Sequence, residues 1–184
     1  MLVLAALAAA ILVKTYVVAA YVIPSASMQP TLQVGDRVLV EKLGYRLHDP
    51  RRGDVIVFDG LDSFTPEVAG THDFVKRVIG VPGDRVRCCD PDGRVTVNGA
   101  PLTESGYLFP GDEPSAIAFD VEVPAGMLWV MGDHRSVSQD SRAHLGDPGG
   151  GMVSVDRVRG RALAVVWPVG RWTALGVPDT SVSG

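Results

Sequence analysis

The first 23 residues form an almost unbroken apolar run in which Lys14 is the one charged residue. A helix of this length would extend about 35 Å, which is enough to cross the hydrocarbon core of a bilayer. Pro24 disfavours helical backbone in the residue before it, so we expect the helix to end near Ile23. A cleavable leader would have its charge ahead of the apolar core, and a buried helix would be less apolar all round. The run is therefore interpreted as a membrane anchor.

Lys14 is the residue that fits an anchor least well. A lysine at the bilayer centre costs about 3 kcal/mol on insertion scales. We therefore place it near the outer interface, where its ammonium can reach the headgroups and Tyr16 and Tyr21 can serve as interfacial aromatics.

Residues 24–184 are predicted to form a mainly β domain. The chain contains 21 glycines and 13 prolines, and many of them separate short β-branched runs, which is typical of an all-β body. The expected strands are 37–42, 55–58, 74–79, 85–88, 95–97, 127–131 and 162–167. Asn98-Gly99 is a strong two-residue hairpin signal. With no long helical pattern between strands, we expect antiparallel sheets in a barrel-like body, with a smaller β lobe inserted at about 88–125.

The charge and the cysteines limit the possible partners. The net charge is −4 and no basic stripe exists, which argues against nucleic acid as a partner. Cys88 and Cys89 are adjacent, and neighbouring strand residues face opposite sides, so an ordinary bridge between them is geometrically poor. We expect two free thiols, or one buried and one exposed, with a strained vicinal disulfide as the alternative. No C-x-x-C spacing indicates zinc or redox chemistry.

Three polar features are candidates for chemistry. Ser25 and Ser27 lie two residues apart between Pro24 and Pro30, so in extended backbone both hydroxyls point to one side of a stiff segment. This segment is either a linker or a nucleophile with a helper.

Lys76 is expected on a strand, on the same face as Phe74 and Val78. Desolvation lowers the pKa of such an amine, and a neutral lysine can act as a general base for a serine hydroxyl. The alternative is a solvent-facing lysine on an edge strand. The third feature is the polar loop 132–142, which follows an apolar run and is either a site loop or a solvated turn.

Together these segments closely resemble type I signal peptidases, the membrane-bound serine peptidases with a Ser/Lys dyad. The matching segments, in order and spacing, are 23–32, 35–42, 74–84 and 132–142. The resemblance implies that Ser27 is the nucleophile and Lys76 the general base. It implies that the Ser25 hydroxyl stabilises the oxyanion beside the backbone N–H of Ser27, and that Ser138 orients the lysine.

The resemblance also implies supporting groups. Asp140 and Arg142 match an ion pair of the loop, and Asp133 and Arg77 look like another. The residues expected to line shallow apolar pockets for small substrate residues are Ile23, Met28, Leu32, Phe74 and Val75. The family loop usually reads Gly-Asp-Asn-Arg-Asp-Asn-Ser, whereas this chain has His134, Ser136 and Val137 in place of Asn, Asp and Asn.

The implied function is removal of signal peptides from exported precursors by a single-pass plasma-membrane enzyme whose β domain lies outside the cytoplasm. The expected partners are signal peptides and membrane lipid. A monomer is expected, with no cofactor and no metal.

Other classes of protein fit the sequence less well. A Ser-His-Asp hydrolase using His134 would want a G-x-S-x-G elbow, which does not occur. A metal site from His72, Asp73, His134 and His144 lacks recognisable ligand spacing. A Ser/Lys self-cleaving repressor would have a soluble DNA-binding head in place of the apolar run. A non-catalytic anchored β domain that binds exported proteins would not need both the serines and the lysine of the dyad segments.

Overall fold

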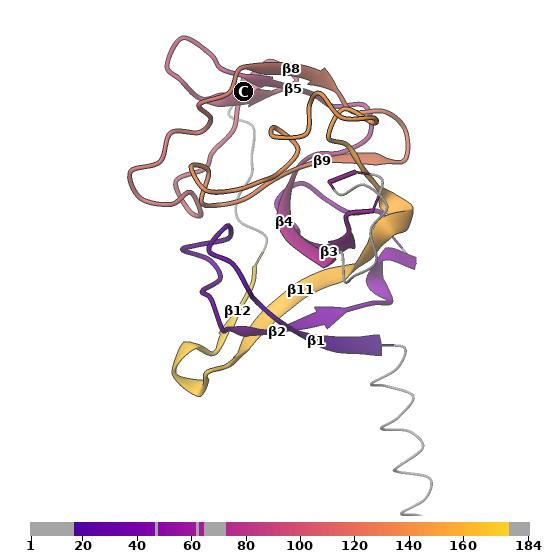
Figure 1. The fold of residues 1–184 in the computed structure, drawn as a ribbon, viewed down its shortest axis with the longest axis vertical. Coiled ribbons are helices and arrows are strands. Elements are labelled where there is room, and N and C mark those ends of the chain that lie inside the picture. Colours follow the sequence, from indigo (N-terminus) through magenta and orange to yellow (C-terminus); the bar gives the residue numbers. More distant parts are fainter. Residues whose placement is uncertain (1–16, 47, 62, 65–72, 177–184) are drawn as a thin grey trace, which may run out of the picture.

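Two antiparallel sheets make up the body of the protein (Figure 1). The computed structural model describes residues 17–46, 48–61, 63–64 and 73–176. The larger sheet has eight strands in the order β1-β2-β11-β3-β4-β9-β10, and β12 pairs with β11. Their bounds are β1 Val18–Val22, β2 Arg37–Glu41, β3 Val55–Asp59, β4 Asp73–Gly80, β9 Met127–Met131, β10 Val153–Ser154, β11 Val158–Trp167 and β12 Thr173–Ala174.

The smaller sheet has four strands in the order β7-β6-β5-β8. Their bounds are β5 Arg85–Cys88, β6 Val95–Val97, β7 Ala100–Pro101 and β8 Phe119–Glu122. Asn98 and Gly99 join β6 to β7 with φ values of 54° and 85°. Positive φ at both central residues is what a type I′ hairpin turn requires, so the predicted hairpin is confirmed. The sheet starts at Arg85, slightly ahead of the lobe boundary expected from the sequence.

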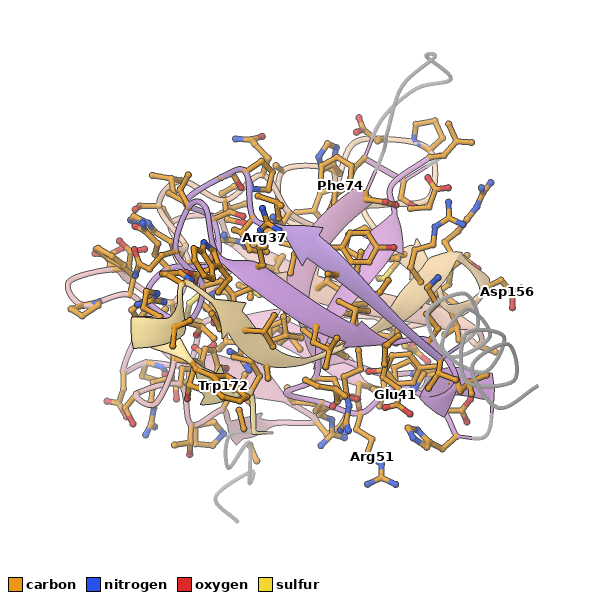
Figure 2. All side chains as sticks on the ribbon, turned by 90° about the horizontal axis from the view of Figure 1, so that it is seen from below. Arg37, Glu41, Arg51, Phe74, Asp156 and Trp172 are labelled. Atoms are coloured by element: carbon orange, nitrogen blue, oxygen red, sulfur yellow. A yellow bond between two sulfur atoms is a disulfide. The ribbon has the colours of Figure 1, made fainter. Side chains whose placement is uncertain are left out.

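The prediction of a helix over residues 1–23 is wrong for Val18–Val22. Val18–Val22 is a strand that pairs with Arg37–Glu41, and Val and Tyr side chains suit a half-buried strand as well as an apolar helix. Figure 2 shows this pair, with Arg37 and Glu41 at opposite ends of β2. Residues 1–16 lie outside the described residues. Within the described part, the helices include the short 3-10 turns η2 Gly44–Arg46, η3 Val155–Arg157 and η4 Val169–Arg171, and none could cross a membrane.

All seven strands predicted from the sequence are present, some with shifted ends. The largest shift is at β11, which begins at Val158 and passes an irregularity in its pairing with β3 before reaching the predicted segment. Gly160 permits this, because a Cβ there would lie 2.0 Å from the carbonyl oxygen of Glu41. The missed strands are β1, β7, β8, β10 and β12, most of which are very short.

Buried apolar side chains join the segment that carries the two candidate serines to the large sheet. Ile23, Met28 and Leu32 are each at most 2% exposed and pack in one cluster with Val38 and Val40 of β2. Burying each such side chain contributes about 1.5–3 kcal/mol. The serine segment is therefore fixed against β2 by its own apolar residues.

Candidate active site

Ser27 and Lys76 are in direct contact. The Nζ atom of Lys76 lies 2.8 Å from the Oγ atom of Ser27, and the two side chains come from segments 49 residues apart. Both are buried, with Lys76 4% and Ser27 8% exposed. The Oγ of Ser25 lies 3.3 Å from the Oγ of Ser27. The structure thus brings together the three residues that the sequence singled out as nucleophile, base and helper.

Burial changes the acid–base chemistry of Lys76. Desolvation lowers its pKa from 10.5 to about 8, with Arg142 acting in the same direction. The carboxylates of Asp140 and Asp133 oppose this shift because they favour the charged ammonium. A lysine with this pKa is substantially neutral at mildly alkaline pH, when its amine can accept the hydroxyl proton of Ser27.

The segment around Ser27 is a closed loop whose ends bond to each other. Ile23 N–H donates to the carbonyl of Asp36, and Gly35 N–H donates to the carbonyl of Ile23, both at 2.9 Å. Inside the loop, Leu32 N–H donates to the carbonyl of Met28. The carbonyl of Ser27 itself accepts from the backbone N–H of His134 at 3.1 Å. The nucleophile is therefore held by its backbone as well as by Lys76.

Two buried ion pairs hold the loop 132–142, as the sequence predicted. Arg77 Nη2 lies 2.6 Å from Asp133 Oδ2, and Arg142 Nη2 lies 2.8 Å from Asp140 Oδ2. The carboxylate of Asp140 also accepts from the backbone N–H of Gly132 at 2.9 Å. Burial opposes ionisation of Asp140, but Arg142 and these hydrogen bonds hold its pKa below the ordinary value. Asp140 thus remains a carboxylate beside Lys76.

Ser138 lies at the site but does not make the contact expected of it. A Cβ on Gly132 would lie 2.2 Å from Ser138 Oγ and 2.5 Å from the carbonyl oxygen of Ser27, so Gly132 lets these two serines approach. The Ser138 hydroxyl is turned toward Asp140 and makes no hydrogen bond of normal geometry within the described residues. The expected hydrogen bond to Lys76 is therefore absent in this conformation.

A groove of about 450 Å³ opens onto the dyad. Of the pocket residues predicted from the sequence, Ile23, Met28, Phe74 and Val75 line it. Leu32 does not, because it is fully buried in the core against β2. The residues that the sequence reasoning missed are Tyr21, Val22, Pro24, Val57 and Asp73. Tyr21 and Val22 were missed because they were assigned to the helix, whereas they end a strand that leads directly into the serine segment.

A segment of the small lobe also supports the site, and we did not predict it from the sequence. We call residues 104–109 the strap. Its Glu104 forms an ion pair with Arg135, and the ring of Tyr107 lies 4.3 Å from the guanidinium carbon of Arg77.

The end of the strap binds the loop a second time. Phe109 N–H donates to the carbonyl of Asp133 at 2.9 Å, and the rings of Phe109 and His134 stack at 3.8 Å. The ring of His134 therefore packs against the strap, while its backbone N–H donates to the carbonyl of Ser27. The sequence signal that could have indicated this contact is His134 itself, an aromatic side chain where the family usually has Asn.

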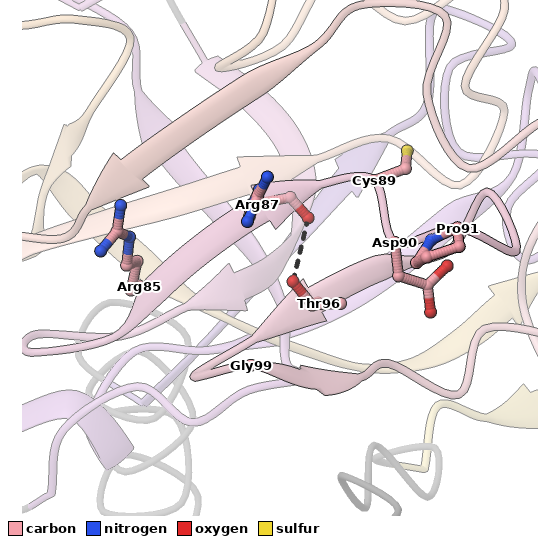
Figure 3. A pocket seen from close by; sticks show the side chains of 7 residues that line it. All are labelled: Arg85, Arg87, Cys89, Asp90, Pro91, Thr96 and Gly99. Carbon is pink, nitrogen blue, oxygen red and sulfur yellow. Dashed lines mark hydrogen bonds between the residues drawn. The ribbon is translucent and has the colours of Figure 1, made fainter.

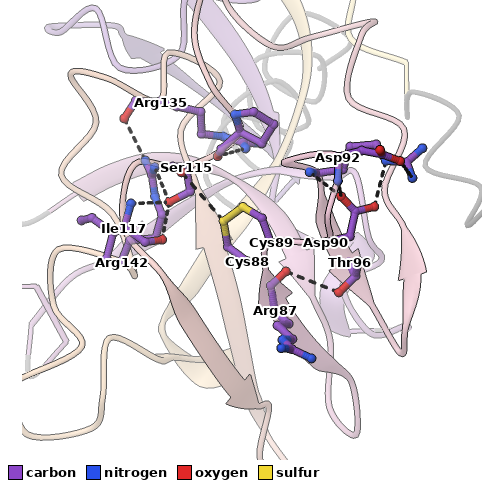
Figure 4. Close-up of a disulfide and its surroundings, with 12 residues drawn as sticks. Arg87, Cys88, Cys89, Asp90, Asp92, Thr96, Ser115, Ile117, Arg135 and Arg142 are labelled. Atoms are coloured by element: carbon purple, nitrogen blue, oxygen red, sulfur yellow. Dashed lines mark hydrogen bonds and ion pairs between the residues drawn. A yellow bond between two sulfur atoms is a disulfide. The ribbon is translucent and has the colours of Figure 1, made fainter.

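The expectation of free thiols at Cys88 and Cys89 is wrong. The two cysteines form a disulfide, and Figure 4 shows it at the end of β5. Cys88 is 8% exposed, and its Sγ lies 3.8 Å from the carbonyl oxygen of Ser115. The argument from alternating side chains failed because the regular strand ends at Cys88, so Cys89 need not face the opposite side.

Comparison with known proteins agrees with this geometry. Residues 1–167 match the sequence model of a protein family that is described as "Signal peptidase, peptidase S26". The chain belongs to this family. The matched span contains Ser25, Ser27, Lys76 and the loop 132–142, so the resemblance predicted from the sequence is confirmed at the level of the family.

Several curated relatives share most of the chain. A probable signal peptidase I of Mycobacterium leprae is 39% identical, over 88% of this chain and 73% of the relative. A probable signal peptidase I-2 of Synechocystis is 42% identical, over 88% and 69%. The signal peptidase I of Mycobacterium tuberculosis H37Rv is 41% identical, over 86% and 68%. The similarity therefore extends over the body of the chain and is not confined to one motif.

Proposed function

We propose that this protein is a serine endopeptidase that removes signal peptides from exported precursor proteins, with Ser27 as nucleophile and Lys76 as general base. The contact of 2.8 Å between Lys76 Nζ and Ser27 Oγ, inside a buried site, is the observation that supports this most directly. Serine is a weak nucleophile at its own pKa and needs a base within hydrogen-bond reach. A lysine serves as that base only when its surroundings lower its pKa, as burial does here.

The reaction follows from these positions. The Oγ of Ser27 attacks the scissile carbonyl while its proton passes to the neutral amine of Lys76. The hydroxyl of Ser25 and the backbone N–H of Ser27 donate to the developing oxyanion, and each such donor contributes about 3 kcal/mol. Lys76 then gives its proton to the leaving amine. In the second half, it takes a proton from the water that hydrolyses the acyl-enzyme.

The ion pairs have a supporting role in this proposal. Asp140 with Arg142, and Asp133 with Arg77, fix the loop whose backbone binds Ser27. Ser138 orients Lys76 once its hydroxyl turns from Asp140 toward the amine. No cofactor and no metal enter the mechanism.

The substrate is proposed from the groove. Its lining is mostly apolar, with Ile23, Met28, Phe74 and Val75 among the residues next to the dyad. An apolar groove disfavours charged side chains ahead of the cut, and the resemblance to signal peptidases implies small ones. We therefore propose cleavage after a small residue in an A-x-A-like site.

We also propose that the enzyme is a monomer attached to the plasma membrane by a single span, with its β domain outside the cytoplasm. The apolar composition ahead of β1 supports attachment, and because Val18–Val22 is a strand, we propose the span only for the residues ahead of it. Such an anchor would keep the groove near the membrane surface, where a translocated precursor emerges.

The test is cleavage of a secretory precursor by the purified full chain in detergent, with the new N-terminus mapped by mass spectrometry. We expect a single cut after a small residue, no cut with Ser27→Ala, and a normal cut with Ser136→Ala, an exposed serine of the same loop. Binding of the precursor without cleavage would favour the alternative, a non-catalytic β domain. Cuts after Lys, Arg or large aromatic residues would overturn the specificity.

A further inference from the structure

The small sheet has a second pocket, open to solvent, of about 720 Å³. Figure 3 shows its lining, to which β5 and the residue after it contribute Arg85, Arg87 and Cys89. Arg85 and Arg87 alternate with the buried Val86 and Cys88, so β5 presents the two arginines on one exposed side, and Cys89 follows directly after the strand. The pocket therefore brings a disulfide-bonded cysteine together with two arginines.

The two cysteines of the disulfide differ in exposure. Cys88 is 8% exposed and packs in the apolar cluster that contains Val86 and Phe119. Cys89 packs against the same cluster, but it is only half-buried and lines the pocket. Thiolates attack a disulfide at the sulfur that they can reach, so access selects Cys89.

The charges around the pocket favour an anionic reagent. Arg85 forms an ion pair with Asp120 at 2.7 Å, and the lining carboxylate of Asp90 forms one with Arg94 at 2.9 Å. Arg87 forms no ion pair with any residue that the structure describes, and its side chain is exposed. Arg87 also acts on the carboxylate of Asp120 and lowers its pKa, but the ion pair of that carboxylate is with Arg85, so Arg87 still presents positive charge to the pocket.

We propose that this pocket is a thiol–disulfide exchange site for small anionic thiols, with Cys89 as the sulfur that is attacked. A thiolate of an anionic dithiol forms a bond to Cys89 Sγ while the Cys88–Cys89 bond breaks, and Cys88 leaves as a thiolate that takes a proton from solvent. The second thiolate of the dithiol then attacks the dithiol's own sulfur in the mixed disulfide and releases Cys89. The protein gains two electrons and the dithiol becomes a cyclic disulfide.

The first test compares reduction of the purified full chain by dihydrolipoate, an anionic dithiol, and by dithiothreitol, a neutral one. Samples are acid-quenched, unfolded and alkylated, and mass spectrometry counts the thiols. We divide the rate with dihydrolipoate by the rate with dithiothreitol. Arg87→Gln should lower this ratio about threefold at low salt, because one unit charge at about 7 Å in water is removed. High salt should abolish the difference between the ratios of the wild type and the variant. Arg51→Gln, at an exposed arginine shortly before β3 of the large sheet, should leave the ratio unchanged.

The second test locates the accessible sulfur. In Cys88→Ser, glutathione disulfide should form a mixed disulfide with Cys89 about tenfold or more faster than it does with Cys88 in Cys89→Ser, because the thiolate of Cys88 is buried. Both variants lose the same disulfide, so its loss cancels from the comparison. Equal rates, a faster reaction at Cys88, an unchanged ratio in Arg87→Gln, or two thiols in untreated protein would each overturn the proposal. None of these measurements uses peptidase activity, so they are independent of the proposed function.

Discussion

At the scale of single residues, the site depends on an amine whose burial suppresses its charge. With the pKa of Lys76 lowered to about 8, the ammonium predominates below that pH and the neutral base above it. We therefore expect kcat/KM to rise with pH through an acid limb near 8, measured on a peptide substrate that has no titrating group in this range. An acid limb near 6 would indicate a histidine base instead.

Substitutions separate the two candidate bases. Lys76→Ala should abolish turnover in a folded protein, and Lys76→Arg should also be inactive because a guanidinium stays protonated. His134→Ala should keep most activity, because His134 contacts Ser27 through its backbone N–H, which alanine retains. Thermal unfolding of each variant provides the control for folding. Near-normal turnover in Lys76→Ala together with loss in His134→Ala would contradict the Ser/Lys mechanism.

At the scale of elements, the sequence predicted the strand that bears Lys76, the segment that bears Ser27 and the loop 132–142, because their residues occur in recognisable local order. It did not predict β1, since an apolar run of Val, Ala and Tyr fits a helix and a half-buried strand equally well. Nor did it predict the strap. The contact of Tyr107 with Arg77 joins residues that no local pattern relates, and only the folded chain brings them together.

The strap yields a prediction about turnover. Tyr107→Ala should lower kcat about tenfold or more, because removing the ring over Arg77 loosens the Arg77–Asp133 pair and small displacements at a site are costly. KM should change little, since Tyr107 does not line the groove. Steady-state kinetics below the unfolding temperature measure both quantities. Tyr107→Phe keeps the ring and Ile117→Ala alters an exposed residue of the same lobe, so both should stay near the wild-type kcat. An unchanged kcat in folded Tyr107→Ala would refute the role of the strap.

At the scale of the whole molecule, the order of the chain places the groove directly after the apolar N-terminal run. Tyr21 and Val22 belong to β1 and line the groove, and Ser25 and Ser27 follow within a few residues. The large sheet then brings β4 and the loop 132–142 to these residues. The connection between the apolar run and the groove is short. A membrane that holds the run would therefore also keep the dyad at a fixed distance from the membrane surface.

This arrangement predicts the topology of the protein in cells. If the apolar run is a membrane span and precursors are cut after translocation, residues 24–184 must lie outside the cytoplasm. Protease added to spheroplasts should then digest the β domain, as detected with an antibody against it, while a cytoplasmic marker protein stays intact. Protection of the β domain until the cells are lysed would place the groove on the wrong side of the membrane for exported substrates. Release of the intact domain by carbonate washing would instead show that the run does not span the bilayer.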